Sequence, residues 1–336
     1  MKKVCIVGAG AIGGFIGTRL AAAGQCEVSA LARGATLQAL RDKGWRMQTA
    51  AGLVQGPVAR AEPDAAALGP QDLVIVAVKG PALTEVARGM GPLLGPQTVV
   101  MPAMNGVPWW FCAGQAGFGD TLDSVDPGGI IAQAIARERV VGCVVHASTS
   151  TPEPGLVQHR MGQGLIVGEP AGGAGGTSER VQRIAALLAG AGFDTTVSEN
   201  IRYDIWYKLW GNMTINPVSA LTRATGDLIL GDPLVRAFCS AAMGEAQAIG
   251  ARIGCPISQT PEERHAITAK LGALRTSMLQ DVEASRAIEL DAIVGVVHEI
   301  GRRLEIATPN IDALLGLTRL FGRVNGLYPV GPAAAS

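Results

Sequence analysis

The chain is poor in aromatic residues and has no excess of charge of either sign, and both shortages exclude classes of function. Phe, Trp and Tyr make up 4% of the 336 residues, and 28 basic residues balance 28 acidic ones. Proteins that bind nucleic acid or membrane surfaces concentrate positive charge, so we expect neither partner. No apolar run reaches the roughly 18 residues needed to cross a bilayer.

The cysteines and histidines show no metal-binding or disulfide pattern. The six cysteines contain no Cys-x-x-Cys pair, and several stand inside apolar runs, which is typical of buried, reduced thiols. The four histidines are scattered along the chain, so we expect no metal site. Reduced thiols are typical of the cytoplasm, which is the location that we predict.

A glycine-rich turn stands near the start of the chain, between an apolar run and an alanine-rich helical pattern. It has the sequence Gly8-Ala9-Gly10-Ala11-Ile12-Gly13-Gly14. In such a turn Gly8 permits the tight bend, Gly10 lets a pyrophosphate approach the backbone, and Gly13 lets the helix lie close to the strand. The helix N terminus offers N–H groups to the phosphates. We therefore predict that a dinucleotide cofactor is bound by Gly8, Gly10, Ala11, Ile12 and Gly13.

The residue after the second predicted strand indicates which dinucleotide is bound. A strand-like stretch over 26–32 leads into Arg33, and no acidic residue lies between Val28 and Arg41. A site that prefers NAD places Asp or Glu here, about 20 residues after the last motif glycine. A guanidinium instead matches a 2′-phosphate, so Arg33 predicts NADP (NADPH). The alternative is that Arg33 is an ordinary solvated arginine.

Strand and helix patterns alternate up to about residue 200, whereas the chain beyond it has helical patterns alone. Later strand-like runs lie at 73–78, 98–101, 140–146, 164–167 and 193–197. Helical patterns lie at 201–215, 233–249, 261–271, 279–304 and 311–321. We predict an α/β protein with an N-terminal Rossmann-type doubly wound sheet and a C-terminal all-helical domain. The NADP-binding domain is placed at residues 1–199 and the helical substrate-binding and catalytic domain at 200–336.

Polar residues follow two of the predicted strands. Lys79 comes directly after the run at 73–78, and Asn105-Gly106 follows the run at 98–101. Ligands of open α/β sheets bind at the carboxyl ends of the strands, so Lys79 could contact a cofactor phosphate. Asn105 could contact the ribose, the nicotinamide amide or the substrate. The alternatives are a solvated lysine and a plain Asn-Gly turn.

The helical half contains a row of polar residues among apolar neighbours. Lys208, Asn212 and Asn216 are spaced by four residues, which places them on one face of a helix. Burying polar groups costs free energy unless they are paired, so polar residues at these positions indicate a functional role. Pro217 disfavours regular helix at the residue before it and favours a kink there. The alternative is a solvated stripe on an amphipathic helix.

A glutamate also stands inside a mostly apolar helical pattern farther along the chain. Glu289 is flanked by Ile288 and Leu290, and Arg286 is three residues before it. A salt bridge between Glu289 and Arg286 is the alternative to a functional role.

In their order along the chain, these motifs resemble the ketopantoate reductase (2-dehydropantoate 2-reductase) family over nearly the whole length. The resemblance rests on the glycine turn, Arg33, Val78-Lys79, Asn105-Gly106, Lys208 with Asn212 and Asn216-Pro217, and Ser277-Met278-Leu279-Gln280-Asp281 with Glu289. It implies NADPH-dependent reduction of the small 2-oxo acid 2-dehydropantoate to D-pantoate, a step of pantothenate and coenzyme A biosynthesis. It implies catalytic roles for Lys208 and Glu289, substrate binding by Asn212, Asn216 and Ser277, and a place at the cofactor edge for Arg33, Lys79 and Asn105, the last of which could also bind substrate.

The chain also departs from the family pattern at three places. Ile288-Glu289-Leu290 replaces a common Thr-Glu-Ile, Val294-Gly295 replaces a common Asn-Gly, and a substrate-contacting asparagine is replaced near Gly226. These losses leave open a paralogue that reduces another branched 2-oxo acid. A reductase of a β-hydroxy acid or an imine, and a non-catalytic NADP-binding sensor, are further alternatives. The sequence also leaves a homodimer open.

Overall fold

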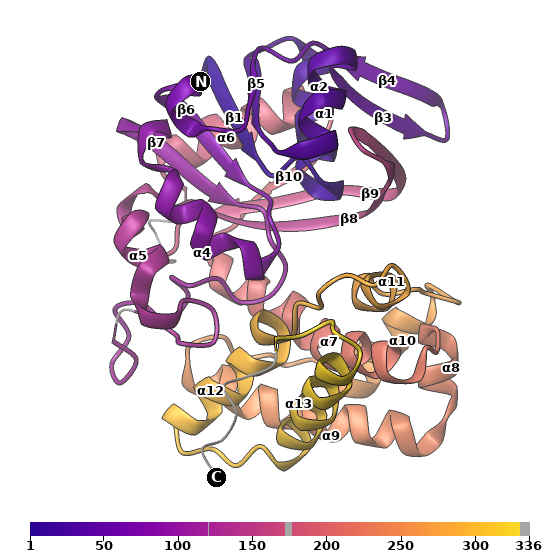
Figure 1. Ribbon diagram of the computed structural model, residues 1–336. Helices are drawn as coiled ribbons and strands as arrows, with labels where there is room; N and C mark the ends of the chain where they lie inside the picture. Colours follow the sequence, from indigo (N-terminus) through magenta and orange to yellow (C-terminus); the bar gives the residue numbers. More distant parts are fainter. Residues whose placement is uncertain (120, 172–176, 330–336) are drawn as a thin grey trace. The chain divides into compact units, whose positions relative to one another are not determined.

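The computed structural model describes residues 1–119, 121–171 and 177–329, and the chain forms two compact units (Figure 1). Unit 1 comprises Met1–Phe111 and Gly129–Ile205, and unit 2 comprises Cys112–Gly128 and the chain from Trp206 onward. The change of unit near residue 205 lies close to the predicted domain boundary at 199/200. No pattern in the sequence assigned Cys112–Gly128 to the helical unit.

The first sheet of unit 1 is parallel, and its order places the N-terminal strand in the centre (Figure 1). The order is β5 (Ala61–Glu62), β2 (Glu27–Leu31), β1 (Lys3–Val7), β6 (Gln71–Val76) and β7 (Leu94–Pro102). The inner strands are continuous apolar runs because a parallel sheet is covered on both faces. Along the chain, β2 and β5 are added on one side of β1, and β6 and β7 are then added on its other side. The topological switch point therefore lies between β1 and β6.

A second sheet combines the predicted strand runs at 140–146, 164–167 and 193–197, which were expected to extend the first sheet, with a hairpin. Its order is β10 (Asp194–Val197), β9 (Leu156–Gly168), β3 (Trp45–Thr49) and β4 (Gly52–Gly56), and β8 (Gly142–Glu153) pairs with β9. Strand β8 pairs with β9 in the antiparallel direction. The β3–β4 hairpin was not predicted, and β3 joins β9 to this second sheet by pairing with it.

Helix α1 (Ala11–Ala23) lies between the two sheets because its glycines permit close approach on both sides. A Cβ at Gly13 would lie 2.9 Å from Ile6 on β1, and one at Gly17 would lie 2.6 Å from the Trp45 ring on β3. The remaining helices of unit 1 are α2 (Gly34–Lys43), α3 (Ala65–Leu68), α4 (Gly80–Gly89), α5 (Ile130–Ala134) and α6 (Glu179–Gly190), with 3₁₀ turns at Gly91–Leu93 and Arg137–Arg139. A further 3₁₀ turn, Pro127–Gly129, spans the change from unit 2 to unit 1.

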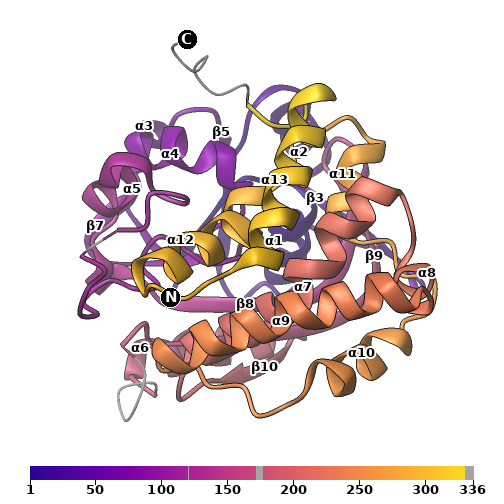
Figure 2. The ribbon, with the colours of Figure 1, turned by 90° about the horizontal axis from the view of Figure 1, so that it is seen from below.

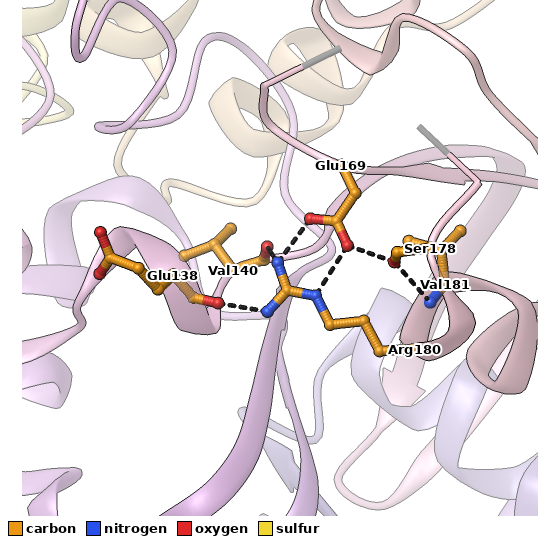
Figure 3. Close-up of polar contacts among 6 residues, drawn as sticks. All are labelled: Glu138, Val140, Glu169, Ser178, Arg180 and Val181. Carbon is orange, nitrogen blue, oxygen red and sulfur yellow. Dashed lines mark hydrogen bonds and ion pairs between the residues drawn. The ribbon is translucent and has the colours of Figure 1, made fainter. Parts of the chain in front are cut away.

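One arginine joins three segments of unit 1 (Figure 3). Arg180, near the start of α6, donates through Nε at 2.7 Å and through Nη2 at 2.5 Å to the two carboxylate oxygens of Glu169, which follows β9. It also donates to the carbonyls of Glu138 and Val140. Ser178 donates to Glu169 and caps α6 by accepting from the Val181 N–H. Both carboxylate oxygens of Glu169 therefore accept hydrogen bonds, as a charged side chain that is only 12% exposed requires.

Unit 2 is helical over its described residues from Trp206 onward, whereas Cys112–Gly128 consists mainly of turns. It contains most of α7 (Ile201–Thr222), together with α8 (Gly226–Gly231), α9 (Pro233–Arg252), α10 (Pro261–Ala269), α11 (Ser277–Glu283), α12 (Val296–Arg303) and α13 (Pro309–Val324). Helices α8, α10, α12 and α13 pack on the long helix α9 (Figure 2). The Trp210 indole on α7 donates to the Met243 carbonyl on α9 at 2.9 Å. None of the helices described is long and apolar enough to cross a membrane.

The prediction of one helix over 279–304 is wrong. Helix α11 ends at Glu283, Ser285 adopts a positive φ of 51°, and helical structure resumes with a π-helical turn at Asp291–Gly295 before α12. The chain turns because Arg286 donates to Asp281 through both its N–H (2.8 Å) and its guanidinium (3.2 Å). These contacts close the turn that interrupts the helix.

Candidate functional site

The register of the first sheet brings the predicted cofactor residues of unit 1 to one edge. Val7 aligns with Leu31 on one side and with Val76 on the other, and Val76 aligns with Pro102. The ladder continues beyond these residues through Ala77 N–H to Val7 (2.9 Å) and Ala103 N–H to Val76 (2.8 Å). The segments carrying the glycine turn, Arg33, Lys79 and Asn105 therefore all leave the sheet at its carboxyl edge, as predicted.

The glycine turn has the backbone and space that its sequence predicted. Gly8 has a φ of +90°, and a Cβ at Gly13 would lie 2.0 Å from the Gly8 carbonyl oxygen, so both positions require glycine. A Cβ at Gly10 would meet nothing within 4 Å. Helix α1 begins after Gly10 with no side-chain cap and no acidic residue in its first turn. A helix N terminus beside open backbone fits a pyrophosphate.

The other cofactor candidates lie at the starts of helices or loops beyond the strands. Arg33 is the N-cap residue of α2, and Lys79 is the N-cap residue of α4. Asn105 is half-buried in the loop after β7 and precedes Gly106, whose φ is +82°. The Arg33 side chain is 69% exposed, and its Nη1 lies 2.6 Å from Oε1 of Glu85 on α4. Sequence reasoning missed Glu85 because it lies 52 residues from Arg33.

The polar row of unit 2 lies on one buried helix. Helix α7 continues through Pro217 to Thr222, so it does not end at Asn216. Asn216 is 6% exposed, and Lys208 and Asn212 are half-buried. The row is therefore not a solvated stripe, and its polar groups lie where apolar packing would otherwise be expected.

A chain of hydroxyl groups joins the end of the row to α11. Ser219 donates its single hydroxyl proton to the Asn216 carbonyl at 2.7 Å. Thr276 must then donate to Ser219, 2.5 Å away, because each hydroxyl has one proton. Thr276 accepts in turn from the Leu279 N–H at 3.1 Å and so caps α11. Because Ser277 is the first residue of α11, this chain fixes Asn216 relative to Ser277. Sequence reasoning missed both Ser219 and Thr276.

The glutamate candidate lies outside regular helix. Glu289 is half-buried and precedes the π-helical turn, and the neighbouring Ile288 N–H donates to the Leu327 carbonyl at 3.0 Å. The alternative, a helical i−3 pair with Arg286, does not have its helical geometry here, because residues 286–289 lie outside helix and Arg286 forms an ion pair with Asp281 at 3.2 Å.

The departure near Gly226 has a structural basis. The Gly226 N–H donates to the Leu274 carbonyl at 2.9 Å, and a Cβ at residue 226 would lie 3.2 Å from the Cβ of Leu274. A side chain at this position requires the 272–274 loop to move. Among the described residues, no group of three His, Cys, Asp or Glu side chains could hold a metal ion.

Comparisons with known proteins agree with this arrangement. Residues 4–172 match the model "Ketopantoate reductase PanE/ApbA", and residues 200–321 match "Ketopantoate reductase PanE/ApbA C terminal". The chain is 42% identical to a 2-dehydropantoate 2-reductase of Mesorhizobium japonicum over 97% of this chain and 99% of the relative.

Solved structures give the same result. A crystal structure from Ralstonia solanacearum MolK2, provisionally named a ketopantoate reductase, is 56% identical with a TM-score of 0.92, covering 98% of this chain and 100% of that one. The 2-dehydropantoate 2-reductase of Methylococcus capsulatus is 28% identical with a TM-score of 0.79, covering 96% and 97%. The predicted resemblance is confirmed, and the chain belongs to the ketopantoate reductase PanE/ApbA family.

Proposed function

We propose that this protein is an NADPH-dependent oxidoreductase that reduces 2-dehydropantoate to D-pantoate, a step of pantothenate and coenzyme A biosynthesis. The observation that carries the proposal is the 42% identity to a 2-dehydropantoate 2-reductase over nearly the full length of both chains. The buried polar row of α7 supports a catalytic protein over a non-catalytic sensor, because a sensor needs no proton donor there.

The nicotinamide cofactor, when bound, supplies the hydride, and unit 1 supplies its binding residues. Gly8, Gly10 and Gly13, with the N–H groups of Ala11 and Ile12, bind the pyrophosphate at the start of α1. The guanidinium of Arg33 binds the 2′-phosphate and so favours NADPH.

Two further residues complete the cofactor edge. Lys79 contributes positive charge near the phosphates, and Asn105 hydrogen-bonds the ribose, the nicotinamide amide or the substrate. The register that aligns the ends of β1, β6 and β7 supports both assignments.

Unit 2 supplies the groups that act on the substrate. Lys208, as an ammonium, stabilises the negative charge that develops on the carbonyl oxygen and donates the proton to it. Asn212, Asn216 and Ser277 hold the carboxylate and hydroxyl of the substrate by hydrogen bonds. Glu289 orients the substrate hydroxyl or keeps Lys208 protonated.

The test is NADPH consumption by the purified protein with 2-dehydropantoate, 2-oxoisovalerate and bulkier 2-oxo acids, repeated with NADH. We expect 2-dehydropantoate to give the highest kcat/KM and NADPH to be preferred. Preference for another 2-oxo acid would assign the protein to a paralogous activity, for which the tight packing at Gly226 is the first place to look. Cofactor binding without turnover on any acid would contradict an enzymatic role.

The hydroxyl chain predicts a specific substrate-binding defect. Thr276→Val keeps the shape of the side chain but removes the donor to Ser219 and the cap of α11, so Asn216 and Ser277 lose their fixed spacing. We expect KM for 2-dehydropantoate to rise about fivefold to tenfold with a smaller change in kcat, from the loss of roughly 1 kcal/mol of hydrogen bonding. Thr276→Ser retains the hydroxyl and should restore KM. Equal KM values for Val and Ser variants would contradict the positioning role.

We propose that the protein works in the cytoplasm, and its six cysteines, which form no disulfide, support a reducing compartment. A homodimer stays a prediction, which sedimentation analysis of the purified protein tests directly.

A further inference from the structure

The carboxylate of Glu85 contacts the guanidinium of Arg33, the residue that follows the second strand of the first sheet. Sites that prefer NAD use an Asp or Glu at the end of the second strand to bind the ribose 2′-hydroxyl. The sequence offers no acid there, only Arg33. The structure brings one from α4, since Oε1 of Glu85 lies 2.6 Å from Nη1 of Arg33.

The ion pair is exposed and easily exchanged. The Arg33 and Glu85 side chains are 69% and 67% exposed, and such pairs contribute only about 0–1 kcal/mol to stability. The ion pair therefore contributes little to the stability of the fold. Because Arg33 follows the strand at the carboxyl edge of the first sheet, where the glycine turn also lies, the pair can instead affect which ligand binds there.

The two side chains respond oppositely to the two cofactors. A 2′-phosphate gains the Arg33 guanidinium but shares it with the Glu85 carboxylate, so it has a like charge nearby. A ribose 2′-hydroxyl can donate to Glu85 while Arg33 stays paired with it. The carboxylate thus weakens binding of NADPH and favours binding of NADH.

We propose that Glu85 is a specificity-determining residue that reduces the preference for NADPH set by Arg33, so that the protein also accepts NADH. The inference rests on the proposed function, because it places the adenosine ribose at Arg33. It goes beyond that function by assigning the degree of cofactor selectivity to a residue from another helix.

The test compares kcat/KM for NADPH and NADH in Glu85→Gln, Arg33→Gln and the unchanged protein. Glu85→Gln keeps the size of the side chain and removes its charge. We expect the NADPH-to-NADH ratio of kcat/KM to rise about threefold to tenfold, mostly through KM for the cofactor, since one charged contact is changed. The matched control is Glu153→Gln, which removes the carboxylate paired with Arg46 at 3.2 Å in the second sheet and should leave the ratio unchanged.

The Arg33 variant separates failure of the inference from failure of the proposed NADPH site. An unchanged or lower ratio in Glu85→Gln overturns the inference. If Arg33→Gln then weakens NADPH binding at least tenfold, the NADPH site stands without the role of Glu85. If Arg33→Gln leaves NADPH binding unaltered, both assignments fail together.

Discussion

Replacing Lys208 with alanine is expected to lower kcat for 2-dehydropantoate about a thousandfold while leaving the Kd for NADPH within about twofold of its original value. The loss combines general-acid catalysis with stabilisation of the developing oxyanion, and each of these typically contributes about 10²-fold or more. NADPH affinity should persist because the proposed cofactor residues all belong to unit 1. Single-turnover absorbance at 340 nm and fluorescence titration with NADPH measure the two effects.

Two further variants make this result specific. Lys208→Arg keeps a positive charge but does not release a proton near neutral pH, so it should retain oxyanion stabilisation without proton transfer and lie between the alanine variant and the unchanged protein. Lys270, the other lysine after residue 200, is exposed at the end of α10, and Lys270→Ala should have full activity. Full activity of Lys208→Ala would remove this residue from the mechanism.

The features that local sequence determines were predictable. Gly8 is required because its φ is positive, and Gly13 is required because a Cβ there would clash with the Gly8 carbonyl oxygen. Both reasons involve residues only a few positions apart, so the local sequence is enough to predict them. The common edge for Lys79 and Asn105 followed from the rule for open parallel sheets, and the register confirms it. The roles of the site residues in binding and catalysis stay predictions.

The features that depend on distant pairing were not predictable. The pairing of β3 with β9, and the Arg33–Glu85 contact, join segments far apart in the chain. The interruption after α11 is local, but the two bonds from Arg286 to Asp281 that close it form only once the chain has turned. Periodicity over 279–304 contains no sign of this turn, because apolar residues continue on both sides of it.

The largest effect expected on stability comes from Arg180→Met. This substitution leaves the carboxylate of Glu169 partly buried and without its guanidinium, and it removes the donor to the carbonyls of Glu138 and Val140 (Figure 3). We expect the free energy of unfolding at pH 7 to fall by about 2–4 kcal/mol, since breaking a buried pair costs more than its net contribution. Urea unfolding followed by circular dichroism measures the change.

The pH dependence of this loss identifies Glu169 as its cause. Burial opposes ionisation of Glu169, but hydrogen bonds from Arg180 and Ser178 outweigh it and lower the pKa of the carboxyl below its usual 4.5. The stabilising effect of the pair is therefore present above pH 4.5 and is lost as the pH falls through the lowered pKa. In Arg180→Met, protonation instead relieves a buried charge. The difference between variant and unchanged protein should accordingly narrow as the pH falls through about 4.5.

Two comparisons test whether the loss belongs to the buried pair. Arg183→Met removes the partner of Glu179 on the same helix, 3.9 Å away, but that pair is 59% and 87% exposed, so its loss should cost less than about 0.5 kcal/mol. Adding Glu169→Gln to Arg180→Met removes the unpaired charge and should restore part of the stability. If the double variant is no more stable than Arg180→Met at pH 7, the loss comes from the unpaired carbonyls of Glu138 and Val140, because the charge of Glu169 then contributes nothing to it.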